Sequence, residues 1–148
     1  MPTITANQAI RNAVAAELAS ARFYTLLADS TEDRETRAFL EEMADLERKH
    51  ARDIEEMGTK IVEGPLAEQA DTDVSMVETL PDWRYVDDIT LPQALDVALA
   101  AEQQAALYYD ALADFLEGPA MEFFQQLAKQ EEEHAAALEK RRKKLGLA

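Results

Sequence analysis

The sequence has no cysteine among its 148 residues, and this absence removes several kinds of site at once. Without a thiolate the chain offers no disulfide, iron–sulfur cluster, rubredoxin-type iron site or thiol nucleophile. Glycine and proline are scarce, at 4 and 5 residues, which favours long uninterrupted helices. The apolar runs are too short to span a bilayer, and the first residues lack the pattern of a signal peptide. We therefore expect a cytoplasmic protein with no membrane partner.

Positive charge is also in short supply. The chain has 15 lysines and arginines against 30 acidic residues, which gives a formal net charge of -15. Nucleic acid is not expected as a partner, because binding its phosphates requires clustered basic residues. The acidic balance suits a protein that handles cations, although solubility alone would also account for it. Because 47% of the residues are hydrophobic, a packed core is expected.

Hydrophobic periodicity predicts four helices, at about 6–29, 33–57, 91–116 and 119–144. Capping and breaking residues favour these boundaries. They are the candidate capping boxes Thr5–Gln8 and Thr90–Gln93, the candidate N-caps Ser30 and Thr31, Gly58 as a helix end, and the break at Gly118-Pro119.

The segment 58–90 shows no clear period and is too long for an ordinary connection. It is typical of a crossover that runs along a bundle and joins two hairpins. Trp83 and Tyr85 are expected to pin it to the bundle, and a short helix is conceivable at about 66–70. The sequence thus predicts an all-α fold: one domain over residues 1–148, built as a four-helix bundle of two helical hairpins.

The two predicted hairpins look like copies of one unit. Residues 16–24 align with 101–109, so that a glutamate, an alanine and an aromatic pair coincide. Residues 39–54 align with 123–138, and this alignment superposes both histidines of the chain. Two such hairpins packed together would have an approximate twofold axis.

Each histidine lies three residues after a glutamate, as Glu47/His50 and Glu131/His134. This spacing places both side chains on one helix face. Glu17 and Glu102 occupy the other two helices, and the residues that share a face with each of the four glutamates are uncharged. The glutamates also lie at similar heights from the hairpin turns, so all six side chains can converge on one layer.

Four carboxylates in one core need a compensating positive charge, because burying an unpaired carboxylate costs several kcal/mol or forces it to take up a proton. No lysine or arginine lies on these helix faces. Two divalent cations would restore neutrality. The sequence therefore predicts a two-metal site with six ligands, and carboxylates with imidazoles suit iron or manganese. The predicted ligands are Glu17, Glu47, His50, Glu102, Glu131 and His134.

With one glutamate on each of two helices and E-x-x-H on the other two, the chain resembles the ferritin-like di-metal carboxylate proteins. Within them it looks most like the rubrerythrin-like branch, over all four helices. The resemblance implies two iron ions, with manganese or a mixed Fe/Mn pair as alternatives. It implies that Glu47 and Glu131 bridge the metals, and that Glu17 with His50, and Glu102 with His134, complete them. Tyr24 and Tyr109 would be hydrogen-bond donors beside the site or, equally, plain core aromatics.

Two departures from that family matter. Ala105 stands where rubrerythrins carry an additional glutamate, so the redox-dependent ligand movement of that family does not carry over. A cysteine-rich rubredoxin domain is absent from the sequence, so the electron donor is expected to be a separate protein or small molecule. The ligand set also resembles bacterioferritin ferroxidase sites, but the short spacing between each glutamate and its E-x-x-H fits those less well.

The leading functional hypothesis is a di-iron oxidoreductase that reduces H₂O₂, or O₂, with an external electron donor. The alternatives are a ferroxidase that stores or sequesters iron, and a hydroxylase with an organic substrate. The hydroxylase would need a pocket near the small residues Ala13, Ala21, Ala98 and Ala106. A bundle with protonated glutamates and no metal is the remaining alternative. A homodimer, in which hairpins exchange between subunits, is left open.

Overall fold

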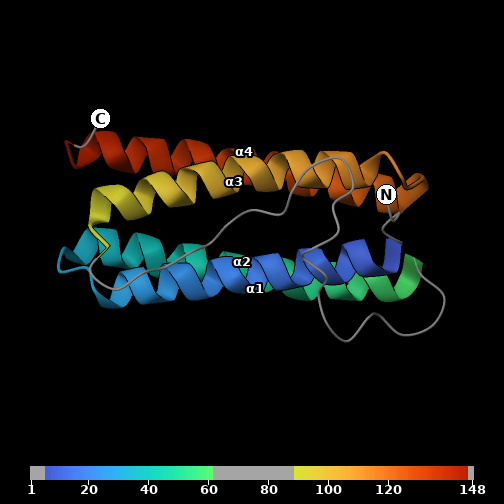
Figure 1. Ribbon diagram of the computed structural model, residues 1–148, viewed down its shortest axis with the longest axis horizontal. Coiled ribbons are helices and arrows are strands. Elements are labelled where there is room, and N and C mark those ends of the chain that lie inside the picture. The colour runs from blue at the N-terminus through green and yellow to red at the C-terminus, as the bar shows by residue number, and fades with distance from the viewer. Residues whose placement is uncertain (1–5, 62–88, 147–148) are drawn as a thin grey trace.

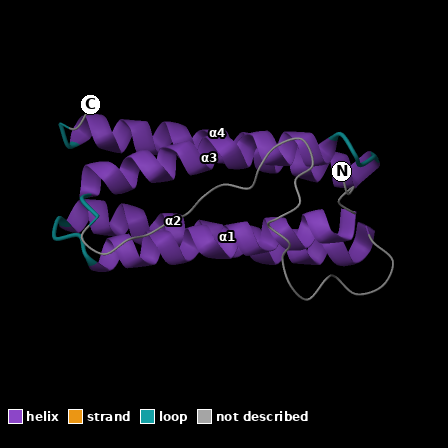
Figure 2. Ribbon diagram, in the orientation of Figure 1, coloured by secondary structure: helices purple, strands orange, loops and turns teal. Residues whose placement is uncertain are grey.

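The computed structural model describes residues 6–61 and 89–146, and these residues form an all-α bundle (Figure 1). The helices are α1 (Ala6–Asp29), α2 (Arg34–Ile61), α3 (Leu91–Ala113) and α4 (Gly118–Lys144). Helices account for nearly all of the described chain, and the remainder of it is short turns (Figure 2). The predicted ferritin-like four-helix bundle is confirmed. Within these residues, no helix is both long enough and apolar enough to cross a bilayer.

The bundle consists of two antiparallel hairpins, with α1 packed on α2 and α3 packed on α4. Helices α2 and α3 run in the same direction (Figure 1), so the C-terminus of α2 and the N-terminus of α3 lie at opposite ends of the bundle. This arrangement is the one that a crossover between hairpins requires. The predicted positions of Trp83, Tyr85 and the short helix at 66–70 lie outside the described residues.

The start of α2 differs from the expectation. Asp33, rather than Ser30 or Thr31, caps this helix: its Oδ2 accepts hydrogen bonds from the Thr36 backbone N–H at 2.9 Å and from the Thr36 hydroxyl at 2.6 Å. The Thr31 hydroxyl instead donates to the Leu27 carbonyl at 2.7 Å, which closes the end of α1.

The end of α2 also differs. The helix continues through Gly58 to Ile61, so the expected stop at this glycine was wrong. Helix propensity alone penalises an interior glycine by about 1 kcal/mol, and that penalty does not end a helix that already packs along the bundle. The Thr5–Gln8 capping box at the start of α1 falls partly outside the described residues.

The second hairpin agrees more closely with the predicted boundaries. At α3 the Thr90–Gln93 capping box is confirmed: the Thr90 hydroxyl accepts from the Gln93 N–H, and the Gln93 side chain accepts from the Thr90 N–H. Helix α3 ends at Ala113, three residues earlier than predicted. Gly118 opens α4 with φ +61°, a backbone conformation that glycine adopts without strain.

The core divides into two apolar clusters, one on each side of the glutamate–histidine layer. One cluster includes Ile10, Val14, Ile54, Leu112 and Phe124. The other includes Phe23, Leu27, Leu40, Leu95 and Leu138. In α1 the first cluster precedes Glu17 and the second follows it, so the acids are held between two dry layers.

Candidate metal centre

The structure brings all six predicted side chains together in the middle of the bundle. The four glutamates are almost fully buried, with exposed fractions of 0–2%, and the histidines are 6% and 9% exposed. Glu17 comes from α1 and Glu102 from α3, while α2 and α4 each supply a glutamate and a histidine. Glu132 and Glu133, the other acids beside His134, are exposed as the spacing predicts.

The histidines link the two hairpins. His50 Nδ1 lies 3.2 Å from Glu131 Oε1 and 3.8 Å from Glu17 Oε2. His134 Nδ1 lies 2.9 Å from Glu47 Oε1 and 3.4 Å from Glu102 Oε2. Each imidazole thus faces one glutamate of its own hairpin and the E-x-x-H glutamate of the other hairpin. The rings are stacked, with centroids 5.3 Å apart and an interplanar angle of 10°.

One atom of each side chain makes no hydrogen bond, although these atoms face one another as possible ion pairs. In these six side chains, the buried atoms without a hydrogen bond are Glu17 Oε2, Glu47 Oε1, His50 Nδ1, Glu102 Oε2, Glu131 Oε1 and His134 Nδ1. A buried polar atom left unpaired costs about 1–3 kcal/mol, and here six of them converge on one place. Ligand atoms from Glu47, His50, Glu131 and His134 all lie within 4.8 Å of one another. Oxygen and imidazole nitrogen atoms in this arrangement fit divalent transition-metal ions.

Burial and the neighbouring carboxylates together shift the pKa values of the glutamates. Burial, reinforced by neighbouring carboxylates, raises the pKa of Glu17, Glu47 and Glu102, and that of Glu47 reaches about 8. Burial also opposes ionisation of Glu131, but interactions with Glu102 and both histidines outweigh it and lower the Glu131 pKa.

The pKa values of both histidines are raised as well. Burial works against their charged forms, yet the facing glutamates outweigh it and raise the pKa of His50 to about 10 and that of His134 still further. Without a metal, the cluster therefore neutralises itself with protons. A metal ion that binds there must displace protons, because ligation needs ionised glutamates and neutral histidines.

Two tyrosines hold the glutamates that lie outside the E-x-x-H motifs. The Tyr24 hydroxyl on α1 donates to Glu102 Oε1 at 2.9 Å, and the Tyr109 hydroxyl on α3 donates to Glu17 Oε1 at 2.5 Å. Burial, together with the nearby carboxylates, raises the pKa of both phenols well above the ordinary value, so they stay protonated as donors. Each bond crosses from one hairpin to the other, and each leaves the second carboxylate oxygen of its glutamate facing the centre.

Sequence reasoning missed Ser20. Its hydroxyl lies 2.7 Å from Glu47 Oε2 and 2.8 Å from the Glu17 carbonyl oxygen. The serine follows Glu17 by three residues and therefore shares its helix face, which is the signal that would have identified it. In the repeat its counterpart is Ala105, so the second hairpin has no equivalent hydroxyl.

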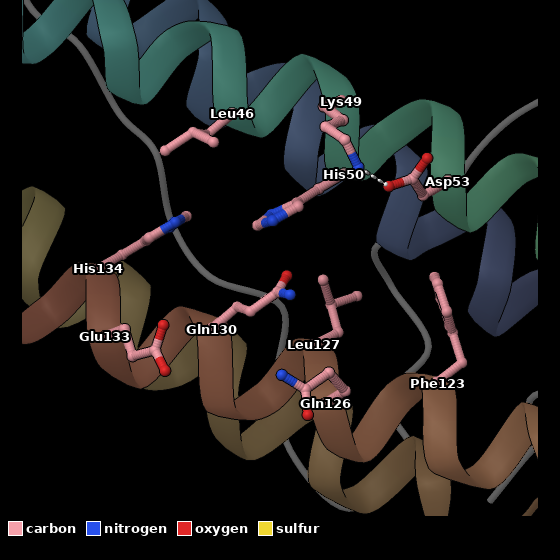
Figure 3. Close-up of a pocket in the computed structure, with 10 residues that line it drawn as sticks. All are labelled: Leu46, Lys49, His50, Asp53, Phe123, Gln126, Leu127, Gln130, Glu133 and His134. Carbon is pink, nitrogen blue, oxygen red and sulfur yellow. Dashed lines mark hydrogen bonds and ion pairs between the residues drawn. The ribbon is translucent and has the colours of Figure 1, made fainter.

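A groove between α2 and α4 reaches the two histidines (Figure 3). It encloses about 480 Å³, and its lining includes Leu46, Lys49, Phe123, Leu127 and Gln130 in addition to His50 and His134. Sequence analysis suggested that space for a substrate could lie beside four alanines of α1 and α3. Those alanines, Ala13, Ala21, Ala98 and Ala106, are buried and line no part of this groove.

Comparison with known proteins agrees with the geometry. No curated protein sequence matches the chain. A solved structure from Thermotoga maritima, proposed to be a ferritin-like diiron-carboxylate protein, superposes with a TM-score of 0.75 at 25% sequence identity, covering 95% of each chain. The sequence model of the rubrerythrin family matches residues 8–140, which include all four helices and all six predicted ligands. This chain belongs to the rubrerythrin family.

Proposed function

We propose that the protein is a di-iron oxidoreductase that reduces hydrogen peroxide with electrons from an external donor. The convergence of six buried ligand atoms that make no hydrogen bond carries this proposal. Family membership supports it, because the solved relative is itself proposed to be a diiron-carboxylate protein. Manganese, or a mixed Fe/Mn pair, is the alternative occupant that the same ligand atoms would accept.

The contacts support a division of labour among the six residues. Glu47 and Glu131 each approach a histidine of the opposite hairpin, which suits carboxylates shared between two ions. Glu17 approaches His50 and Glu102 approaches His134, which suits ligands of separate ions. Two ferrous ions held here would supply the two electrons that convert H₂O₂ into two waters.

The surrounding residues would fix the ligands and keep bulk water out. Tyr24 and Tyr109 hold the Glu102 and Glu17 carboxylates by one oxygen each, and Ser20 holds Glu47 in the same way. Such partners orient ligands and typically affect metal affinity or activity 10–100-fold. The two apolar clusters on either side leave the groove along α2 and α4 as the approach that the structure describes.

Rapid mixing tests the proposed reaction. Anaerobic protein loaded with two Fe²⁺ per chain is mixed with H₂O₂ and, separately, with O₂, and the oxidation of iron is followed by absorbance. We expect the peroxide reaction to be the faster one, with one H₂O₂ consumed per pair of irons. A faster reaction with O₂, or no reaction with peroxide, contradicts it.

A ferroxidase that stores or sequesters iron is the second candidate. The net charge of -15 favours it, because an acidic protein attracts Fe²⁺. Storage requires a hollow assembly of many subunits, so light scattering discriminates between the candidates. A monomer or a dimer excludes storage, whereas a large shell that retains many irons per chain favours it.

A further inference from the structure

The groove between α2 and α4 has an amphipathic lining that the proposed peroxide chemistry does not need. Its apolar side chains are Leu46, Phe123 and Leu127, and side-chain amides at Gln126 and Gln130 lie among them (Figure 3). A volume of about 480 Å³ is far more than peroxide requires, and it falls within the ordinary range of pockets for small organic ligands.

The histidines present an unused donor to this groove. Nδ1 of each ring faces the glutamates, which leaves Nε2 on the far side of the imidazole. Metal-bound histidines usually donate this second N–H to a carboxylate, a carbonyl or water. Among residues 6–61 and 89–146, no such acceptor contacts Nε2 of His50 or His134. Unlike the two Nδ1 atoms, these Nε2 atoms are not among the buried atoms that lack a hydrogen bond. Two N–H donors are thus available to a molecule in the groove.

The groove occupies one half of the α2–α4 seam. At the other half, where α2 begins and α4 ends, Arg141 packs over the Phe39 ring at 5.0 Å and reaches Glu35 Oε1 at 3.2 Å. Lys144 joins the same carboxylate oxygen at 2.7 Å. In the repeat, the counterpart of Arg141 is Met57. The half of the seam that holds the groove therefore has no guanidinium group equivalent to that of Arg141.

Charge limits what the groove can hold. Lys49 is already paired with Asp53 at 2.7 Å, and Glu133 adds a negative charge to the lining. An anionic reductant such as a nucleotide would meet no free cation among these lining residues, in a protein whose net charge is -15. A neutral, flat molecule is favoured. Its aromatic face would pack on Phe123 and Leu127, and its hydroxyl oxygens would accept hydrogen bonds from the histidine Nε2–H groups or bond to the glutamine side-chain amides.

We propose that this groove binds a neutral aromatic reductant of the hydroquinone class, edge-on to the histidine rings, and that this molecule is the external electron donor. The inference rests on the proposed peroxide reduction. Both hydroquinone O–H bonds break, a quinone forms, and two electrons and two protons are released. The electrons cross the imidazole rings, the O–O bond of H₂O₂ breaks, and the electrons and protons complete two waters.

Binding is tested apart from redox chemistry with zinc-loaded protein, because zinc has no redox activity. The probe is 1,4-dihydroxybenzene, titrated and followed by ligand-observed and protein-observed NMR. We expect saturable binding with a Kd of about 1 mM or tighter, an ordinary affinity for a ligand of this size. The resonances that shift should belong to His50, His134 and Gln130.

Variants locate the site. Gln126→Trp fills the groove, and Gln130→Leu removes an amide and installs the residue found at its repeat counterpart, Leu46. We expect the Kd to rise at least 10-fold in the first variant and several-fold in the second. Gln125→Trp is the matched control, because this neighbouring exposed glutamine does not line the groove. It should bind like the wild type, and zinc content equal to that of the wild type verifies folding.

A second measurement addresses electron transfer. Oxidised iron-loaded protein is mixed anaerobically with the same hydroquinone, and bleaching of the ferric absorption is timed. The rate should fall at least 10-fold in Gln126→Trp and remain unchanged in Gln125→Trp. No saturable binding, equal binding in Gln126→Trp, or reduction only by a protein donor overturns the inference. If hydroquinone binds and reduces the iron but reduced protein ignores peroxide, the proposed function fails and the groove site stands.

Discussion

The two hairpins are alike at the centre of the bundle and differ around it. Each supplies one lone glutamate, one E-x-x-H pair and one tyrosine that reaches the lone glutamate of the other hairpin. Beside these residues the hairpins differ at individual positions: Ser20 corresponds to Ala105, and Leu46 corresponds to Gln130.

The difference shows which positions the chemistry constrains. Four buried carboxylates must be neutralised together, so a change in one half disturbs the charge balance of both. By contrast, the Ser20 hydroxyl contacts only one of the four glutamates, and the Gln130 amide lines only one side of the groove. A change at either position therefore affects only its own surroundings. We therefore expect substitutions at the centre to affect both halves equally, and substitutions around it to act on one side.

The largest effect is expected from removing a central carboxylate. Glu47→Gln and Glu131→Gln should each weaken metal binding by more than about 100-fold. This loss of affinity exceeds the usual one from removing a residue that only hydrogen-bonds to a ligand. Because the two positions are equivalent, the two losses should agree within a few-fold. Isothermal titration with Fe²⁺ under anaerobic conditions measures this, and Glu42→Gln on the exposed face of α2 is the control. A large loss in only one of the two central variants would break the equivalence of the hairpins.

The second effect is a dependence of stability on pH that metal removes. The folded metal-free protein binds more protons than the unfolded chain, because the pKa of Glu47 is raised to about 8 and that of His50 to about 10. Stability should therefore fall as pH rises from about 5 toward 10. We expect the metal-free Tm to drop by about 5–10 °C between pH 5.5 and 8.5. Metal-loaded protein should lose much less, and a metal-free Tm that rises over this interval would contradict the assignment.

The tyrosines come next. Tyr24→Phe and Tyr109→Phe each remove a hydroxyl that donates to a lone glutamate, at 2.9 and 2.5 Å. Each should weaken metal binding by about 10-fold. In the double variant the two factors should multiply, so that metal binding is weakened by about 100-fold. The same titration detects it. No loss in either variant would make these residues plain core aromatics, which was the competing interpretation of the sequence.

The smallest effect is expected at Ser20, where the halves differ. Ser20→Ala should cost about 1 kcal/mol of unfolding free energy, the usual net value of one hydrogen bond, and should leave two metals bound. Ala105→Ser makes the second half resemble the first and should change stability by less than about 1 kcal/mol. Urea denaturation of the metal-free proteins measures both. A larger loss of unfolding free energy in Ala105→Ser than in Ser20→Ala would contradict this expected order.

The convergence of the six side chains could be predicted from the sequence because burial and helix spacing together determine it. An E-x-x-H pair on an apolar helix face has one buried orientation, and the uncharged residues that share a face with Glu17 and Glu102 predicted that these glutamates are buried too. Local boundaries were harder to predict: Asp33 replaced Ser30 and Thr31 as the cap of α2, and Gly58 did not end that helix. Both depend on how the chain turns and packs, which propensity alone does not specify.

The groove could not be predicted because it arises from the spacing of two helices that are not neighbours in sequence. Its lining comes from residues 46–53 of α2 and residues 123–134 of α4. The small residues that suggested space elsewhere pack closely and are buried. Small side chains thus indicated close helix packing, while the open volume formed where longer side chains of α2 and α4 keep apart.

The most direct test is an anomalous diffraction map from crystals grown with Fe²⁺ in excess, recorded at the iron edge. We expect two strong iron peaks per chain, between the Glu47 and Glu131 carboxylates, each within ligand distance of one histidine Nδ1. The absence of a peak at this cluster despite excess Fe²⁺ would contradict the two-metal site. A map in which these side chains turn outward into water would also contradict it.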